Sequence, residues 1–201
     1  MTTESNKSVF AIVLAAGSAT RFGSAKQLAS YDGIAMVRRA SECAAVCCGS
    51  RSVLVAGHEW RAVIAASAPV SGFVIRNDHY RDGIATSIAA GVRAVEHVAD
   101  AVVVVLADQP LITSAHLAAL IQAWSDDESD IVATSYAGIS GVPALFARNC
   151  FSSLLELEGD RGARTLLDDA RFEVRKIEFA DAAVDVDTVE DLAKISRSAH
   201  N

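Results

Sequence analysis

Three features of the sequence predict a single α/β domain, built as a three-layer sandwich around a mostly parallel sheet. Short apolar runs alternate along the chain with longer segments in which apolar residues recur at helical spacing. The runs are rich in valine and isoleucine without polar alternation, which is typical of strands covered on both faces. The strand–helix–strand order favours parallel strands joined by right-handed crossovers, a Rossmann-like arrangement. The chain has 201 residues, 51% of them hydrophobic, which is enough for one sizeable core.

The first part of the chain supplies most of the predicted sheet. Val9–Ala15 is uniformly apolar and is followed closely by Gly17, and 100–107 is the most apolar run of the chain. Thr113 precedes a helical pattern and is therefore expected to cap it. The strands expected here are Val9–Ala15, Ser52–Ala56, Phe73–Arg76, 100–107 and Ile131–Tyr136, and the helices are 33–48, 58–66, 84–97 and one that begins after Thr113.

The pattern changes after Ser135. Here we expect a strand at 142–146, helices at 150–157 and 162–170, and a late strand at 172–179 for which an antiparallel direction is considered. The closing helix, at 188–196, has Thr188 near its start and acidic residues in its first turn, which suit the helix dipole. No repeat or linker divides the chain, so one domain is expected over 1–201.

The composition argues against several classes of function. A net charge of −7 is unfavourable for a nucleic-acid partner, which is usually bound by a basic face. No apolar run approaches the ~20 residues that span a bilayer, and the polar residues 1–8 do not resemble a secretory signal. We therefore expect a cytoplasmic protein without a membrane or nucleic-acid partner. The cysteines lack the spacing of a zinc site and are interpreted as small core residues: Cys43, Cys47, Cys48 and Cys150.

The strongest candidate for a ligand site is the segment 14–26, Leu-Ala-Ala-Gly-Ser-Ala-Thr-Arg-Phe-Gly-Ser-Ala-Lys, which directly follows the first strand. Ligands of parallel sheets lie at the carboxyl ends of strands, and Gly and Ser there allow backbone N–H groups to converge on an anion. Arg21 adds a planar cation and Lys26 a point charge. Ser24 stands where a P-loop has lysine, and no G-x-G dinucleotide motif occurs. The segment predicts a triphosphate site, with a solvated turn as the alternative.

This loop resembles that of the MobA-like NTP transferases, and within them the molybdenum cofactor cytidylyltransferase branch. Further segments resemble the family in the same order: 83–88 (Gly-Ile-Ala-Thr-Ser-Ile), 106–110 (Leu-Ala-Asp-Gln-Pro), 141–146, 159–167 and 185–191 (Asp-Val-Asp-Thr-Val-Glu-Asp). The resemblance covers nearly the whole chain. It implies a nucleotide-diphospho-sugar transferase-like fold in which about 8–135 binds the NTP and about 136–201 forms the acceptor side.

Nucleotidyl transfer also needs a divalent cation, and Mg²⁺ binds through one or two carboxylates together with phosphate oxygens. Asp108 lies just past the most apolar strand, on the sheet edge that Gly17 occupies, although it could instead cap the following helix. Asp185 and Asp187 are two residues apart on an extended segment, so both face the same way. The resemblance favours Asp187 as the second ligand; otherwise both would only support the closing helix.

The resemblance implies the following roles. Phosphate charge is neutralised by Arg21 and Lys26, and Asp108 and Asp187 hold Mg²⁺. The segment 83–87 begins a helix, and the free N–H groups at that helix N-terminus contribute to binding of the base. The NTP-binding set is Leu14, Ala15, Ala16, Gly17, Ser18, Arg21, Lys26, Gly83, Thr86 and Ser87; the catalytic set is Arg21, Lys26 and Asp108; and the acceptor set is Gly141, Arg161 and Arg164. For Arg161 and Arg164 the alternative is a solvated turn.

The expected reaction transfers CMP from CTP to a phosphorylated acceptor of molybdopterin type. The guanylyl branch resembles Leu-Ala-Gly-Gly, so Ala16 favours CTP over GTP. Val142 stands where related chains often carry His or Asn, which leaves the acceptor open, whereas Val189 in place of the family's Pro changes little. The alternatives are another acceptor, such as a sugar phosphate, or a carrier that hands the finished cofactor to a molybdoenzyme client.

Overall fold

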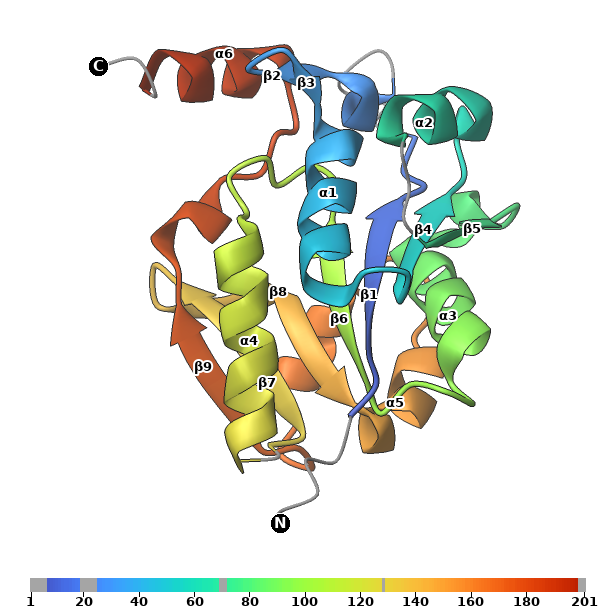
Figure 1. The fold of residues 1–201 in the computed structure, drawn as a ribbon, viewed down its shortest axis with the longest axis vertical. Helices are drawn as coiled ribbons and strands as arrows, with labels where there is room; N and C mark the ends of the chain where they lie inside the picture. Colours follow the sequence, from blue (N-terminus) through green and yellow to red (C-terminus); the bar gives the residue numbers. More distant parts are fainter. Residues whose placement is uncertain (1–6, 19–24, 69–71, 128, 199–201) are drawn as a thin grey trace.

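The computed structural model describes residues 7–18, 25–68, 72–127 and 129–198. Seven strands form one sheet in the order β5-β4-β1-β6-β8-β7-β9 (Figure 1). The strands are β1 (Val9–Ala15), β4 (Ser52–Ala56), β5 (Phe73–Arg76), β6 (Ala101–Leu106), β7 (Ile131–Tyr136), β8 (Ile139–Ala147) and β9 (Val174–Glu178), and a two-stranded hairpin is formed by β2 (Ser30–Tyr31) and β3 (Ile34–Ala35). The α-helices are α1 (Met36–Cys48), α2 (Trp60–Ser67), α3 (Ile84–Val95), α4 (Ser114–Asp127), α5 (Phe151–Leu155) and α6 (Val189–Ser198).

The sheet is mostly parallel, as the sequence predicts. β1 pairs in parallel with β4 and β6, β4 with β5, and β7 with β9. β8 alone among these seven strands is reversed, because it pairs antiparallel with both β6 and β7. The antiparallel direction considered for 172–179 is therefore wrong, since β9 runs parallel to β7. The reversal comes earlier, at Ala137 and Gly138, whose positive φ angles of 49° and 78° form the tight turn between β7 and β8.

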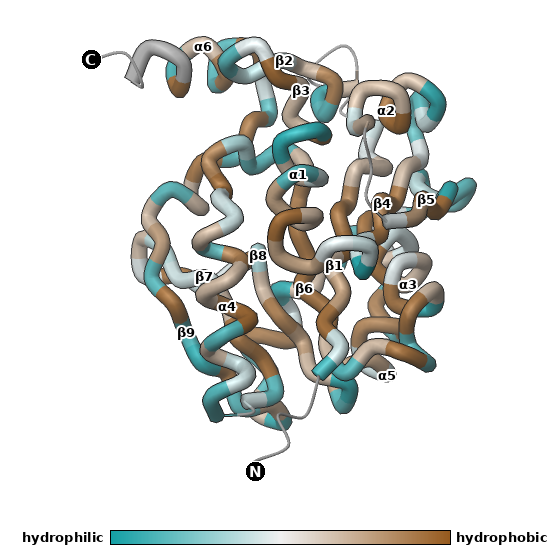
Figure 2. The backbone as a smooth tube through the Cα atoms, viewed as in Figure 1, coloured by the Kyte–Doolittle hydropathy of each residue, from teal (hydrophilic) through white to brown (hydrophobic). Residues whose placement is uncertain are grey.

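Helices cover both faces of this sheet and produce the three layers. In Figure 1, α1, α2 and α4 lie on one face, with α3 and α5 on the other. Along β1, Ala11 and Val13 belong to the apolar cluster under the first group of helices, and Phe10 and Ile12 to the cluster under the second. Figure 2 shows the central strands β1 and β4 as largely brown, hydrophobic segments, whereas β9 at the edge is mixed. The uniform apolar character of the central strands β1, β4 and β6 is thus explained by burial on both faces.

Three predicted helices differ in the structure. The segment 33–48 becomes helical only at Met36, because Asp32 and Gly33 take positive φ angles of 49° and 76° and turn the chain between β2 and β3. The segment 162–170 forms a 3₁₀ helix over Ala163–Asp168 and not an α-helix. The helix α5 is shorter than the predicted 150–157 and follows a 3₁₀ turn at Arg148–Cys150.

The predicted cap at Thr113 is confirmed, and the predicted start of the closing helix carries a reciprocal cap. Oγ1 of Thr113 accepts a hydrogen bond from the backbone N of His116 at 3.2 Å, so Asp108 is not the cap of α4. At the start of α6, Thr188 and Asp191 exchange hydrogen bonds between side chain and backbone at 3.2 and 3.0 Å. None of the helices in the described part of the chain is long and apolar enough to cross a membrane.

Candidate functional site

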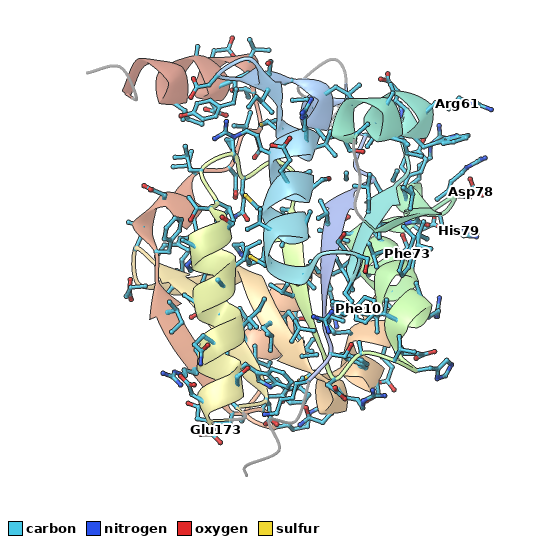
Figure 3. The ribbon with its side chains drawn as sticks, in the orientation of Figure 1. Phe10, Arg61, Phe73, Asp78, His79 and Glu173 are labelled. Carbon is cyan, nitrogen blue, oxygen red and sulfur yellow. The ribbon has the colours of Figure 1, made fainter. Side chains whose placement is uncertain are left out.

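A cleft of about 430 Å³ opens at the carboxyl ends of β1 and β6. This edge is where ligands of parallel sheets bind. In the loop after β5, the side chains of Asp78 and His79 point outward in Figure 3. The next two residues of that loop, Tyr80 and Arg81, line the cleft. The lining residues are Leu14, Ala15, Ala16, Gly17, Ser18, Lys26, Gln27, Tyr80, Arg81, Gly83, Ile84, Ser87, Leu106, Ala107, Asp108 and Asp160. The structure thus brings the loop after β1 and the end of β6 into one cavity.

The loop after β1 is held by a residue that the sequence argument did not identify. The Gln27 side chain is only 3% exposed, and its Nε2 donates to the backbone carbonyls of Ala15 at 3.0 Å and Gly17 at 3.1 Å. The carbonyl of Ala16 accepts a hydrogen bond from the backbone N of His58 at 3.1 Å. The only sequence signal for Gln27 is an amide next to Lys26. Arg21 lies in 19–24, outside the described residues, so its role stays a prediction.

Lys26 connects two acidic segments at the cleft. Its Nζ lies 2.6 Å from Oδ2 of Asp108 and 2.7 Å from Oδ1 of Asp187. Burial of the ammonium lowers the pKa of Lys26, but Asp108 and then Asp187 act more strongly in the opposite sense, and the net pKa is raised. Lys26 is therefore a charged group, placed between two carboxylates.

The segment 185–187 reaches this site through its backbone. The N–H of Val186 donates to the carbonyl of Asp108 at 3.0 Å, and the Val186 side chain is fully buried beside Tyr31. Because alternate residues of an extended segment face opposite ways, Asp185 and Asp187 both point away from that apolar cluster. Of these two aspartates, Asp187 is the one that forms an ion pair with Lys26 in the described structure.

Asp185 has a different environment. Enclosure by its neighbours, followed by the negative charge of Asp108, raises the pKa of Asp185, and the nearby side-chain amide of Gln109 opposes this increase. The residue as a whole remains exposed, so solvent weakens these interactions. The pairing of Lys26 with Asp187 therefore favours Asp187 over Asp185 as the partner of Asp108.

The carboxylates suit a divalent cation that also binds phosphate. Oδ1 of Asp108 is buried and has no hydrogen-bond partner within the described chain. In the same residues, no group of three or more His, Cys, Asp or Glu side chains could hold a metal without other ligands. Mg²⁺ commonly uses one or two carboxylates and completes its shell with phosphate oxygens and water. Asp108 and Asp187 fit that donor set.

The start of α3 forms another wall of the cleft. Gly83 has a φ of 106°, and a Cβ at this position would overlap the carbonyl of Gly159, so only glycine fits. Asn77 is buried and donates through Nδ2 to the hydroxyls of Thr86 and Ser87, both at 2.9 Å. Ser87 lines the cleft with Gly83, whereas Thr86 does not. The Thr86 hydroxyl instead supports the turn before α3.

The predicted acceptor residues lie outside the cleft lining. Arg161 and Arg164 are exposed, and Asp160 is the residue of that segment that reaches the cleft. Gly141 lies against Tyr136, since a Cβ on Gly141 would overlap the tyrosine hydroxyl. Burial and the charge of Asp185 raise the pKa of Tyr136, and the cation of Arg164 opposes this. Tyr136, which the sequence argument missed, therefore lies near Gly141, Arg164 and Asp185.

The cysteines are part of the core. Burial raises the pKa of Cys48 to about 11 and that of Cys150 to about 12, so both thiols stay protonated at neutral pH. Cys43 and Cys47 donate to the backbone carbonyls of Ile112 and Ser114. These contacts agree with the prediction that the cysteines are small packing residues.

Comparison with known proteins identifies the family of this chain and a relative. The family model of the MobA-like NTP transferase domain matches residues 11–175. The purine catabolism protein PucB of Bacillus subtilis (strain 168) is 33% identical over 116 residues, which are 56% of this chain and 55% of the relative. The match therefore spans about half the length of that relative.

Solved structures match over nearly the whole chain. Rv0371c from Mycobacterium tuberculosis H37Rv has a TM-score of 0.84 at 28% identity, covering 95% of this chain and 98% of that one. A complex of Rv0371C with manganese from the same organism has a TM-score of 0.80 at 27% identity, covering 96% and 100%. The family match identifies a nucleotidyltransferase, and one of the matched structures is a complex with manganese. This chain belongs to the MobA-like NTP transferase family.

Proposed function

We propose that the protein transfers CMP from CTP to a phosphorylated acceptor of molybdopterin type, uses Mg²⁺ and releases pyrophosphate. The observation that carries this proposal is the pairing of Lys26 with Asp108 and Asp187, where Lys26 and Asp108 line the cleft after β1. An ammonium and two carboxylates at this edge match the charge needs of a metal-bound triphosphate.

The loop 14–18 supplies the backbone groups that face the nucleotide, and Gln27 fixes its shape. Gly83 and Ser87 at the start of α3 lie across the cleft and contribute to the nucleotide site. Lys26 neutralises phosphate charge, and Arg21 is assigned the same role on the sequence pattern. When bound, Mg²⁺ between Asp108 and Asp187 would neutralise charge on the phosphates.

In the transfer step, a phosphate oxygen of the acceptor attacks the α-phosphorus of CTP. The bond from that phosphorus to the oxygen bridging the α- and β-phosphates breaks, and pyrophosphate leaves with the bonding electrons. No side-chain nucleophile is needed, so catalysis depends on positioning and electrostatic stabilisation. Gly141, Arg161 and Arg164 are assigned to the acceptor side, and the proximity of Arg164 to Tyr136 supports a polar subsite there.

The test is pyrophosphate release by the purified protein with each of the four NTPs, with and without molybdopterin, in the presence of Mg²⁺. Release that requires both CTP and molybdopterin is the expected result. Release with CTP and a sugar phosphate alone would move the proposal to another acceptor. Tight binding of the cytosine dinucleotide without any release would favour a carrier that serves a molybdoenzyme.

A further inference from the structure

Gln109 follows Asp108 at the end of β6 and contacts two other segments of the fold. Its side chain is 4% exposed. The amide Nε2 donates to the backbone carbonyl of Val142 in β8 at 3.2 Å and to that of Ala182 at 3.2 Å. One side chain therefore connects the end of β6, the reversed strand β8, and the 3₁₀ turn Ala180–Ala183.

Both partners lead directly to residues of the proposed site. Val142 is adjacent to Gly141, and Ala182 precedes the segment that carries Asp187 by only a few residues. That segment is also held by Asp108, whose carbonyl accepts from Val186 N at 3.0 Å. The segment is therefore attached to the Asp108–Gln109 dipeptide at two points, by backbone and by side chain. Two attachments fix an orientation, whereas one would leave the segment free to pivot.

The amide is present for its donors and not for its bulk. Oε1 of Gln109 is buried without a hydrogen-bond partner among the described residues. An unpaired buried acceptor destabilises the folded state, and an apolar side chain of similar length would avoid this. Such an exception is expected where the paired end of the group has a specific task.

We propose that Gln109 is a positioning residue that fixes Asp187 and the acceptor strand β8 relative to Asp108. Groups of this kind orient metal ligands without touching the metal, and their loss commonly weakens metal binding about 10–100-fold. The inference rests on the proposed function for the identity of the metal site, but its test needs neither CTP nor an acceptor, because water can complete the shell of a metal held by the two carboxylates.

The experiment measures Mn²⁺ binding to the full chain without nucleotide, from the electron paramagnetic resonance signal of free Mn²⁺. Gln109→Met keeps the length of the side chain and removes both donors, and Asp108→Asn marks the metal site. We expect Gln109→Met to weaken Mn²⁺ binding at least about tenfold. If Gln109→Met does not fold, Gln109→Asn provides the same test, because its shorter amide does not span to both carbonyls.

His116→Leu is the matched control for lost stability. His116 is a buried polar residue that pairs with Thr134 at 2.7 Å and, within the described part of the chain, makes no hydrogen bond or ion pair with Asp108, Asp185 or Asp187. We expect it to lower the melting temperature while Mn²⁺ affinity stays at the wild-type value. Weakened Mn²⁺ binding in His116→Leu equal to that in Gln109→Met would reduce Gln109 to a structural role and overturn the inference.

Kinetics provide a second readout. If CTP and molybdopterin are the substrates, Gln109→Met should raise the KM for the acceptor and lower kcat, with the KM for CTP nearly unchanged. If Gln109→Met binds Mn²⁺ like the wild type while Asp108→Asn loses binding, the positioning role of Gln109 is overturned and the metal assignment stands. Wild-type binding in Asp108→Asn overturns it together with the metal assignment. Failure of CTP as substrate, with the Mn²⁺ result as expected, rejects only the cytidylyl function.

Discussion

The ammonium of Lys26 lies 2.6 Å from Oδ2 of Asp108, where the loop after β1 meets the end of β6. The same ammonium also contacts Asp187, so one cation separates two carboxylates that would otherwise repel each other. A metal-bound triphosphate brings both a competing cation and a competing anion to this arrangement. Lys26 therefore has two roles, one in the free protein and one with the nucleotide bound.

Lys26→Met should separate these two roles. Loss of a charge-assisted contact to phosphate typically costs ~1.5–3 kcal/mol, so kcat/KM for the NTP should fall about tenfold or more. Mn²⁺ affinity in the absence of nucleotide should instead rise, because a cation is removed from between the carboxylates. Lys176→Met makes the same charge change at an exposed position on β9 and should alter neither quantity. Unchanged kinetics in Lys26→Met would remove the phosphate-contact assignment.

Replacing each of the three aspartates with asparagine should show how much each contributes to metal-dependent turnover. Asp108→Asn preserves size and hydrogen bonding but removes the charge that a hard cation prefers, so most metal-dependent turnover should be lost. Asp187→Asn should reduce activity more than Asp185→Asn, because Asp187 alone of the two pairs with Lys26 in the described structure. Initial rates across a Mg²⁺ titration provide the measurement. Equal and mild effects at 185 and 187 would reduce that segment to the start of α6.

The sequence predicted most of the parallel sheet because its strands are buried on both faces. Uniform apolar runs such as β1 and β6 have few other interpretations in a chain with helical segments between them. The site loop and Asp108 were predicted for a related reason, since the carboxyl ends of parallel strands share one edge. The direction of β9 depends on the hairpin between β7 and β8, and local composition carries little information about such long-range pairing.

The supporting residues could not be predicted because their roles depend on distant partners. Gln27 and Gln109 bond to backbone carbonyls, and no side-chain pattern marks which carbonyl an amide will meet. Tyr136 was missed for the same reason, since its proximity to Gly141 follows from the β7–β8 turn. For Thr86, the sequence pattern and the observed contacts differ. Its motif position suggested a ligand contact, but its hydroxyl accepts from Asn77 and bonds within the turn.

Gly83→Ala should damage the nucleotide site through the backbone. A Cβ there would overlap the carbonyl of Gly159, and the φ of 106° is strained for alanine. Gly138→Ala is the matched control, because its φ of 78° is also positive but nothing lies within 4 Å of the added Cβ. Gly138→Ala should cost about 1–3 kcal/mol of unfolding free energy and leave the KM for the NTP unchanged. Gly83→Ala should cost more and also raise that KM; equal effects in the two variants would contradict the close approach.

His116 should make stability depend on pH. Burial lowers its pKa to about 4. The Thr134 hydroxyl donates to the carbonyl of Pro143 and therefore accepts a hydrogen bond from the Nε2–H of His116. The unfolded chain has an ordinary pKa of about 6.5, so it binds more protons than the folded chain below that pH. The contribution is therefore fully present above pH ~6.5 and is lost as pH falls toward ~4, by at most about 3 kcal/mol. Urea unfolding from pH 7 to 4 should show this slope in the wild type and a reduced slope in His116→Leu. Parallel curves for the two proteins would mean that His116 is not held neutral.

The base preference is the last prediction: CTP should be used in preference to GTP, and Ala16 should contribute to the choice. Ala16 lines the cleft, is 4% exposed, and packs so closely on Gly57 that a Cβ on that glycine would lie 2.9 Å from its methyl group. The methyl group of Ala16 therefore has little freedom to move away from a purine base in the cleft. Competition between CTP and GTP at equal concentrations, with the acceptor present, measures the preference directly.

Discrimination by a single methyl group is usually about 10–200-fold, so Ala16→Gly should shift the ratio toward GTP within that range and leave some selectivity to the segment 83–87. Ala15→Gly is the comparison, since it makes the same chemical change one residue earlier in the loop and tests whether added backbone freedom alone relaxes selectivity. A preference for GTP in the wild type would reject the cytidylyl assignment and leave the nucleotidyltransferase family intact. A wild-type preference for CTP that Ala16→Gly does not move would instead reject the steric explanation, and would place base selection in the residues at the start of α3.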